Sequence, residues 1–324
     1  MKNKSIEQGK RKTSLTDIYS KYGIFIILII SIIIASFLSD TFLTPRNLMN
    51  VVRQNSVIMI IAFGSQMVLI SGGTDLSPGS VCAFAGTIST MVMMSTNNIV
   101  IALLVGIMCG VAFGFLNGWV ITTAGIPPFI MTLATQFIGR GAILAITDAQ
   151  PVVGFDSSFT VFGQGYIGPI PLPVVIMLVV LAVYWFMMNR MRFGRYVYAV
   201  GGNEDAARAS GINSKWIKIK AFVFAGGAAG LAGVILMSRL NSGQPTGGEQ
   251  YEFDAITAAI IGGTSMSGGV GKVYGTVVGA LFVGVLLNIM TQMDVSAYYQ
   301  RIVKGAIIAL AVIIDSQVRR ARKI

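Results

Sequence analysis

The sequence contains no histidine and only two cysteines, Cys82 and Cys109, among its 324 residues. Without histidine the chain cannot form a Ser-His-Asp triad or a histidine-ligated metal site. Two cysteines inside apolar stretches do not make the disulfide framework of a small secreted domain, and small buried side chains are their simplest interpretation. We therefore expect no catalytic residue and no metal site in this chain.

Charged residues are also scarce: they make up 11% of the chain, against about 25% in an average soluble domain. Hydrophobic residues make up 54%, and the mean hydropathy is +0.74. Asp75 is the only charged residue between Gln54 and Gly139. At about 20 residues per span, this stretch alone holds about four membrane crossings. The composition excludes an ordinary cytoplasmic globular protein and predicts an all-α polytopic membrane protein.

The charges that are present are mainly basic, with a net charge of +11, and most Lys and Arg residues lie in three clusters. The clusters are an N-terminal tail with Lys2, Lys4, Lys10, Arg11, Lys12 and Lys21, a central segment with Arg190, Arg192, Arg195, Arg208, Lys215, Lys218 and Lys220, and a C-terminal tail with Arg319, Arg320, Arg322 and Lys323. Short basic segments of membrane proteins usually face the cytoplasm. We therefore expect both termini and the central segment to be cytoplasmic, with no nucleic acid partner.

Apolar stretches predict about ten transmembrane segments, six before the central cluster and four after it. The expected segments are approximately 22–39, 55–71, 79–95, 98–122, 126–147, 171–189, 217–238, 253–263, 272–292 and 298–315. Both numbers are even, as they must be if the three basic clusters share one side of the membrane. Segment 253–263 is too short to cross about 30 Å of hydrocarbon as a straight helix. We expect a broken or partial span there.

The pattern divides the chain into five parts. These are a cytoplasmic basic tail (1–21), six transmembrane segments (22–189), a cytoplasmic loop (190–216), four further segments (217–315) and a second basic tail (316–324). An external loop near 148–170 carries two aspartates and no basic residue. The first apolar run is full-length and follows a mostly polar stretch, so we expect an anchor and no cleavable signal peptide. The amphipathic stretch 44–54 is expected to lie in the interface or to fold back.

Two glycine-rich segments interrupt the apolar pattern and resemble each other at five of eight positions: Gly-Gly-Thr-Asp-Leu-Ser-Pro-Gly (72–79) and Gly-Gly-Thr-Ser-Met-Ser-Gly-Gly (262–269). Both are expected toward the cytoplasmic side. They are either turns between helices or part of the inner end of a pathway and its gate. Neither is a nucleotide site, because the sequence around Lys272 lacks the spacing and the hydroxyl residue of a phosphate-binding loop. Energy from ATP would have to come through a partner.

Polar residues inside the predicted spans are mostly neutral. They include Gln66, Thr87, Asn117, Thr132, Thr135, Gln136 and Asn288. Such residues either hold helices together or line a pathway for a neutral, hydroxyl-rich solute, which must not leave polar groups unpaired. Our candidates for a translocation pathway or gate are Asp75, Asn117, Phe129, Thr132, Gln136, Thr264 and Asn288.

The central basic segment contains a capped helix. Asn203 is a good N-cap, Glu204 and Asp205 fit the first turn, and Gly211 can end the helix. We expect a helix from Glu204 to Ser210. Its alanines would let the surface of another protein approach closely, although a simple connection between spans is often helical too.

At this segment the chain resembles the membrane permease subunits of ATP-binding cassette importers for monosaccharides, and ribose permeases are the most similar of these. The resemblance covers nearly the whole chain and rests on residues 72–80, 127–133, 194–204, 206–212, 244–248, 251–256, 262–271, 296–300 and 302–304. Two residues depart from the family pattern: the family often has Ile where Thr74 stands and Val where Pro78 stands.

The resemblance implies a non-catalytic transport subunit of a bacterial cytoplasmic membrane. It implies import of ribose or a similar pentose, with an external sugar-binding protein, periplasmic or lipid-anchored, and a cytoplasmic ATPase that binds ATP and magnesium. It also implies a second permease copy, as a homodimer or a pair with a paralogue. The helix docked on the ATPase would be formed by Gly201, Gly202, Asn203, Glu204, Ala206, Ala207, Ser210 and Gly211.

Two other classes are weighed against this one. An ion-coupled secondary sugar transporter usually has an acidic residue or a histidine at mid-membrane, and Asp75 is the only such candidate deep in the first half. A membrane-embedded enzyme needs a nucleophile or an acid-base pair, and the sequence shows neither. The secondary transporter is therefore the alternative that stays open.

Overall fold

The structure, a computed structural model, describes residues 15–322. The basic residues predicted for the tail at 1–14, and Lys323, lie outside the described residues. The described part is mostly helical, as the composition predicts. Its helices are α1 (Leu15–Leu38), α2 (Pro45–Ile70), α3 (Pro78–Thr96), α4 (Ile99–Ala124), α5 (Pro128–Thr147), the 3-10 helix η1 (Ser157–Thr160), α6 (Val161–Gln164), α7 (Leu172–Asn189), α8 (Arg192–Gly202), α9 (Glu204–Ala209), α10 (Ser214–Leu240), α11 (Tyr251–Ile261), α12 (Val273–Gln292) and α13 (Ala297–Arg322).

Each of the ten predicted apolar segments corresponds to one helix: α1 to α5, α7 and α10 to α13. Within the described residues, eight of these helices are long and apolar enough to cross a membrane. The two shorter ones are the apolar part of α1, Gly23–Leu38, and α11, which has 11 residues as the prediction of a partial span requires. The chain is thus a multi-pass membrane protein, and the number of ten crossings stays a prediction.

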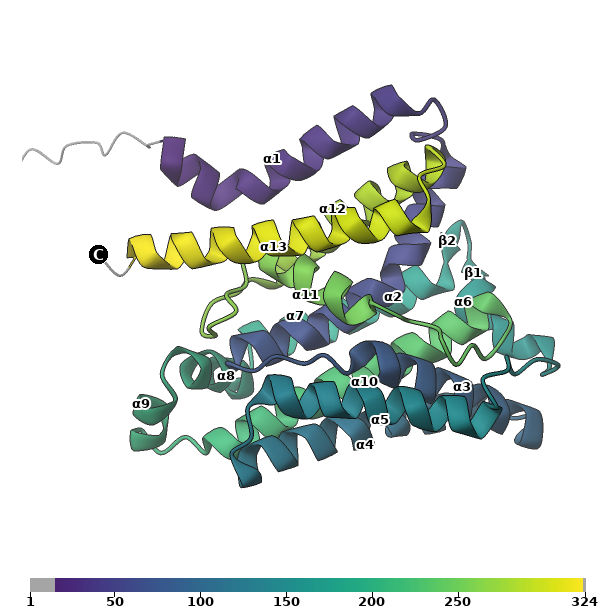
Figure 1. The fold of residues 1–324 in the computed structure, drawn as a ribbon, viewed down its shortest axis with the longest axis horizontal. Coiled ribbons are helices and arrows are strands. Elements are labelled where there is room, and N and C mark those ends of the chain that lie inside the picture. The colour runs from purple at the N-terminus through teal and green to yellow at the C-terminus, as the bar shows by residue number, and fades with distance from the viewer. Residues whose placement is uncertain (1–14, 323–324) are drawn as a thin grey trace, which may run out of the picture.

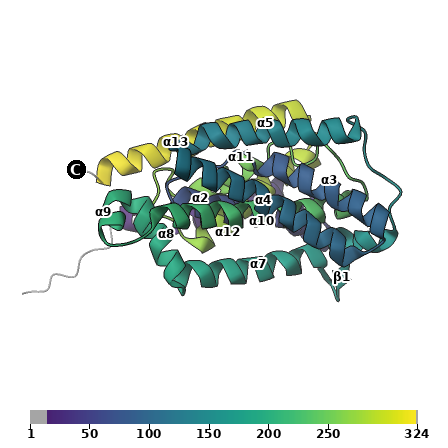
Figure 2. The ribbon, with the colours of Figure 1, turned by 90° about the horizontal axis from the view of Figure 1, so that it is seen from below.

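The centre of the bundle is formed by α2 and α10. In their most apolar stretches 83% and 78% of the residues are buried, against 6% in α13. Figure 2 shows α2 and α10 inside the bundle and α13 at its edge. The backbones of α4 and α10 approach closely because both helices carry glycines at their contact. A Cβ atom on Gly110 would lie only 2.9 Å from Cα of Gly230. This is the small-residue packing by which membrane helices associate.

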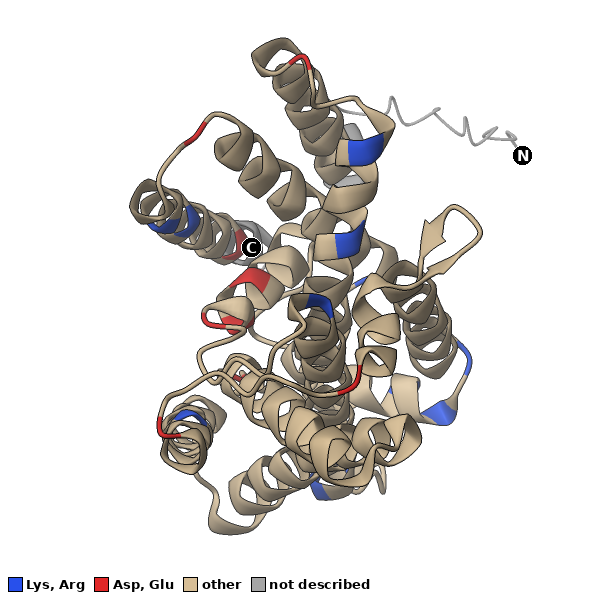
Figure 3. Ribbon diagram, turned by 90° about the vertical axis from the view of Figure 1, so that its right-hand side faces the viewer, with Lys and Arg blue, Asp and Glu red and all other residues tan. Residues whose placement is uncertain are grey.

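The two ends of the bundle differ in what they carry. The described C-terminal end of α13, the start of α1 and the short helix α9 lie at the left end in Figure 1, and α6 with the hairpin lies at the right end. The hairpin pairs β1 (Tyr166–Ile167) with β2 (Ile170–Pro171) in antiparallel register. The loop predicted near 148–170 therefore lies at the opposite end from α9. Figure 3, which views the bundle from the hairpin side, shows how few charged residues it carries.

The amphipathic stretch 44–54 does not fold back, because it forms the first turns of α2, which is longer than the predicted span 55–71. Its place in the membrane interface stays a prediction. Thr44 caps the helix by accepting a hydrogen bond from the backbone N–H of Asn47 at 3.3 Å, and Pro45 occupies the first helical position. Both features favour a helix start at this point.

In the loop between α5 and α7, Asp156 caps η1. Its carboxylate accepts a hydrogen bond from the backbone N–H of Ser158 at 2.7 Å. The hydrogen bonds from Ser158 lower the pKa of the Asp156 carboxyl below its ordinary value, because they stabilise the charged form. The loop is therefore anchored locally by an ionised side chain.

Candidate functional site

The two glycine-rich segments lie against each other and against the end of α8. The backbone N–H of Gly269 donates a hydrogen bond to the carbonyl of Ile70 at 2.9 Å. A Cβ atom on Gly268 would lie 3.0 Å from Cα of Gly72, and one on Gly201 would lie 2.8 Å from the nitrogen of Gly269. Three backbone segments that are far apart in sequence thus meet where only glycine fits.

The predicted helix after this contact is present as α9, one residue shorter than expected. Asn203 is its N-cap, as predicted, and its side chain accepts a hydrogen bond from the backbone N–H of Ala206 at 2.9 Å. Gly211 follows the helix with φ +81°, the left-handed conformation that ends helices. The sequence signals for this helix are therefore confirmed.

Glu204 fixes α9 to α10. Its carboxylate forms ion pairs with Arg208, at 2.5 Å, and with Lys218 of α10. Partial burial alone would raise the pKa of Glu204. Hydrogen bonds from Lys218 and Ser214 and the charges of Lys218 and Arg208 outweigh this effect and lower the pKa below its ordinary value. Glu204 is therefore ionised at neutral pH.

The residues predicted to dock on a partner differ in exposure. Gly202, Asn203, Ala206, Ser210 and Gly211 are exposed, and Gly201 and Glu204 are half-buried. Ala207 is only 5% exposed and faces the bundle. The helical period of 3.6 residues turns Ala207 toward the bundle when Ala206 and Ser210 face outward. Docking of this helix on a partner stays a prediction, and it would use the outward-facing residues.

Asp75 lies in a buried hydrogen-bonded cluster with residues of α4 and α5. Its carboxylate accepts a hydrogen bond from the hydroxyl of Ser77 at 2.6 Å, and the amide of Asn117 donates to the same hydroxyl oxygen at 3.1 Å. The hydroxyl of Thr135 donates to the Asn117 side-chain oxygen at 2.5 Å. This network holds the non-helical segment 71–77 inside the bundle, where every polar group needs a partner.

Thr132 completes the anchoring of this segment. Its hydroxyl oxygen lies 3.1 Å from the backbone N–H of Leu76, which donates to it, and 3.2 Å from the carbonyl of Thr74. Thr132 is fully buried. It therefore binds the backbone of the first glycine-rich segment and is not open to a solute.

Glu252, at the start of α11, is a buried acidic residue that the sequence analysis missed. It is 2% exposed, and its Oε1 accepts a hydrogen bond from the side-chain amide of Gln136 at 3.1 Å. Its Oε2 has no hydrogen-bond partner among the described residues. Arg140, one turn beyond Gln136 on α5, donates to the carbonyls of Pro245 and Gly247 at 2.6 and 3.0 Å. The connection from α10 to α11 is thus held by polar groups of α5.

An ion pair joins α11 to α13 on the same side of the bundle. Asp254 of α11 is 3% exposed and pairs with Lys304 of α13 at 2.8 Å. Because α11 is short and starts inside the bundle, its first turn places two carboxylates, Glu252 and Asp254, within the helix layer. The two carboxylates have different partners, Gln136 for Glu252 and Lys304 for Asp254.

The structure does not bring the other predicted pathway residues into this cluster. Thr264 accepts a hydrogen bond from Gln66 at 2.8 Å, and Gln66 in turn accepts one from the hydroxyl of Tyr184 at 2.8 Å. Asn288 exchanges amide hydrogen bonds with Asn47, both at 3.0 Å. Phe129 is 51% exposed near the start of α5. Thr264 and Asn288 thus have other side-chain partners, and Phe129 adjoins the cluster only through its carbonyl, which accepts a hydrogen bond from Thr132 at 3.4 Å.

The comparisons with known proteins agree with this picture. The family model described as branched-chain amino acid transport system / permease component matches residues 47–312. The ribose import permease protein of Bacillus subtilis is 40% identical over 97% of this chain and 98% of that protein. The ribose import permease protein of Escherichia coli K12 is 41% identical over 90% of this chain and 92% of that protein.

A further relative is the D-allose transport system permease protein of Escherichia coli K12, which is 38% identical over 96% of both chains. No solved structure is significantly similar to this chain. Since the family model covers most of the chain and the relatives are covered nearly end to end, the chain belongs to this permease family.

Proposed function

We propose that this chain is the membrane-spanning subunit of an ATP-binding cassette importer that moves ribose or a similar pentose into a bacterial cell across the cytoplasmic membrane. An external binding protein would deliver the sugar, and a cytoplasmic ATPase would bind ATP and magnesium and supply the energy. This chain itself would catalyse no reaction and bind no cofactor. The names of its relatives, two ribose permeases and an allose permease, support the class of solute.

The observation that carries the proposal is the contact of Gly201 with both glycine-rich segments. Gly201 is the second-last residue of α8, and α9 follows directly. A displacement of α9 by a docked ATPase would be transmitted to residues 72–79 and 262–269, because their backbones are in contact with Gly201 without intervening side chains. Close-packed contacts of this kind do not absorb a shift, so the segments must rearrange together.

We propose that the solute passes along the face formed by α5, α11 and α13, and that a second copy of the chain covers this face. Gln136 and Arg140 on α5 and Lys304 on α13 are only partly buried there. Exposure of these polar groups to lipid would be energetically unfavourable. Covered by a second copy, they would line a polar route, and Gln136 with Glu252 could exchange hydrogen bonds with the hydroxyl groups of a sugar.

In this proposal the other predicted residues have supporting roles. Asp75, Asn117 and Thr132 hold the first glycine-rich segment in place, and Thr264 holds the second through Gln66. When α8 and α9 move, these hydrogen bonds would have to rearrange before the inner end of the route opens. The permease would then release the sugar without binding it tightly, because recognition resides in the external protein.

The experiment that tests this function is uptake of labelled ribose into vesicles that contain the chain, its ATPase and its binding protein. We expect uptake to need ATP and all three components, so that omitting any one of them abolishes it. Uptake by a complex without the ATPase would contradict the proposal.

An ion-coupled secondary sugar transporter is the second candidate, and one observation favours it. Glu252 is buried, and among the described residues one of its oxygens has no hydrogen-bond partner, as in a proton-carrying carboxyl inside a membrane protein. This candidate predicts that the chain alone takes up sugar and that a protonophore stops the uptake. The same vesicles therefore decide between the two functions.

A further inference from the structure

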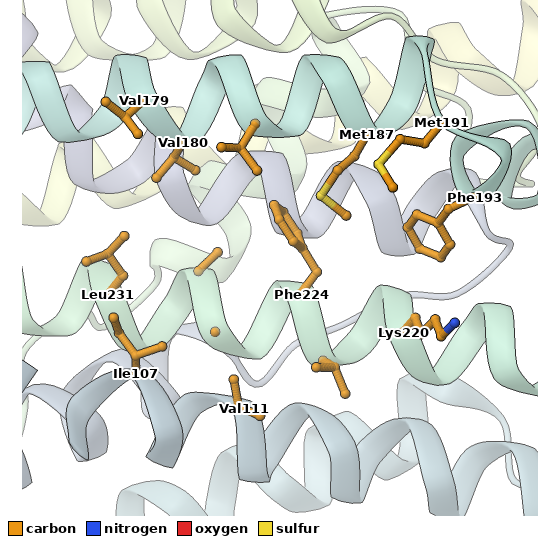
Figure 4. A pocket seen from close by; sticks show the side chains of 14 residues that line it. Ile107, Val111, Val179, Val180, Met187, Met191, Phe193, Lys220, Phe224 and Leu231 are labelled. Atoms are coloured by element: carbon orange, nitrogen blue, oxygen red, sulfur yellow. The ribbon is translucent and has the colours of Figure 1, made fainter. Parts of the chain in front are cut away.

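An apolar groove lies between α4, α7 and α10, on a different side of the bundle from the α5–α11–α13 face (Figure 2). Its volume is about 600 Å³, within the range of pockets that hold small ligands, about 300–1,000 Å³. Figure 4 shows its walls: Val179 and Met187 come from α7, Ile107 and Val111 from α4, and Leu231 from α10. Nothing in the proposed transport route uses this groove.

The groove has one charged residue, Lys220, and it lies at one end. It sits beside Phe193 at the corner where α7 turns into α8, while Leu231 lies at the other end (Figure 4). Lys220 is exposed and forms no ion pair within the described part of the chain. Arg190 and Arg192 flank the groove residue Met191 in sequence. The groove is thus apolar along its length and positively charged at the end nearest α8.

The dimensions of the groove match one leaflet of a bilayer. From Lys220 to Leu231, α10 advances by about 16 Å at about 1.5 Å per residue. One leaflet contributes half of a hydrocarbon core of about 30 Å, which is about 15 Å. Lys220 lies in the second turn of α10, near the end of the bundle that carries α9. A positive charge at the membrane interface matches the phosphate headgroup of a phospholipid, and an apolar groove as deep as one leaflet matches its acyl chain.

We propose that this groove is a binding site for an anionic phospholipid, with the phosphate headgroup at Lys220 and an acyl chain along α7 and α10. The groove opens toward lipid, because Val179 and Val183 are 58% and 49% exposed. A neutral helix of a second copy would cover Lys220 without compensating its charge, which is unfavourable away from water. An anionic headgroup compensates it.

The test is native mass spectrometry of the purified full-length chain titrated with phosphatidylglycerol or with phosphatidylcholine. We expect the wild type to retain phosphatidylglycerol more strongly. The variant Lys220→Gln should weaken that retention about fivefold, the effect of one basic residue at an anionic surface. Arg195→Gln is the matched control: it removes one exposed charge of α8 outside the groove-lining set and should retain the lipid as the wild type does.

Two variants that fill the groove test the acyl-chain part. At Gly227, a Cβ atom would meet only Val111 Cγ2, at 3.2 Å, so Gly227→Leu projects into the groove. Val183→Trp fills it from the exposed side of α7 and keeps the test valid if Gly227→Leu does not fold. Both should reduce retention of both lipids. Wild-type retention of phosphatidylglycerol in Lys220→Gln, or in a folded filling variant, would overturn the site, as would a disulfide between Val183→Cys residues of two copies.

Discussion

The carboxylate of Glu204, the first residue of α9, is paired with the ammonium group of Lys218, in the first turns of α10. This pair connects the exposed helix α9 to a helix that is central to the bundle. Glu204 also pairs with Arg208 on its own helix. The start of α9 is therefore held both by the charge pairs of Glu204 and by the glycine contact of Gly201, three residues earlier in the chain.

Replacing Glu204 tests the first of these connections. Glu204→Gln should lower the free energy of unfolding by at most about 1 kcal/mol, because partly exposed ion pairs contribute little. It should reduce ATP-driven uptake more strongly, since α9 would no longer be held against α10. Asp205→Asn is the control, because Asp205 is exposed and forms no ion pair among the described residues. Unchanged uptake in Glu204→Gln would contradict the role of the pair.

The same carboxylate predicts a pH dependence. Because the pKa of Glu204 is lower in the folded chain than in the unfolded chain, its contribution to stability is complete above the ordinary glutamate pKa of about 4.3. The contribution is lost as the pH falls further, through the lowered pKa. Thermal unfolding of the wild type and of Glu204→Gln should therefore differ by a constant amount from pH 7 to about pH 5 and converge below it. A difference that does not begin to decrease below the ordinary glutamate pKa of about 4.3 would show that the pairing is not electrostatic.

The buried cluster around Asn117 gives a stability prediction. Thr135→Val removes the hydrogen bond to the Asn117 side-chain oxygen and leaves that oxygen unpaired, which costs about 1–3 kcal/mol. Thr123→Val is the matched control, because its exposed hydroxyl bonds only to the carbonyl of Trp119 on the same helix. Thermal unfolding in detergent should show a lower midpoint for Thr135→Val alone. Equal midpoints would mean that the cluster does not stabilise segment 71–77.

The proposed second copy is tested by cysteine cross-linking. In a chain with both native cysteines replaced by alanine, Phe137→Cys on α5 should form a disulfide between two copies, because Phe137 is 72% exposed on the face with polar side chains. Val183→Cys on α7, which lies on another side of the bundle, should not (Figure 2). Cross-linking through Val183→Cys but not through Phe137→Cys would place the interface elsewhere.

Much of the fold could be predicted from the sequence, because apolar runs determine membrane helices directly. The short segment at 253–263 and the cap at Asn203 could be predicted for the same reason: length and capping are local properties. The beginning of α2 was missed because the polar residues of 44–54 do not look like a span, although Thr44 and Pro45 are a local start signal.

The site could be predicted less well, because it depends on contacts between distant segments. Glu252 lies one residue before the apolar run of α11, and only its contact with Gln136, 116 residues earlier, shows that it is buried. The sequence offered one indication of this site: two acidic residues, Glu252 and Asp254, directly at the start of an apolar segment. The contact of Gly201 with Gly269 has no signal in the sequence beyond the glycines themselves, which are equally common in turns.

Gly201 tests the central claim, that the segment before α9 controls the two glycine-rich segments. The measurement is the amount of ribose taken up per ATP hydrolysed by the complete complex in vesicles, for Gly201→Ala and for Gly202→Ala. A Cβ atom on Gly201 would collide with the backbone of Ile70 and lie 2.8 Å from the nitrogen of Gly269, whereas one on Gly202 meets nothing within 4 Å.

We predict that Gly201→Ala continues to hydrolyse ATP but takes up at least about fivefold less ribose per ATP, since misplacing a packed contact by a side chain costs about 1–3 kcal/mol. Gly202→Ala should lose less, because its Cβ atom is accommodated within this chain. A wild-type ratio of ribose to ATP in a folded Gly201→Ala complex would contradict the account.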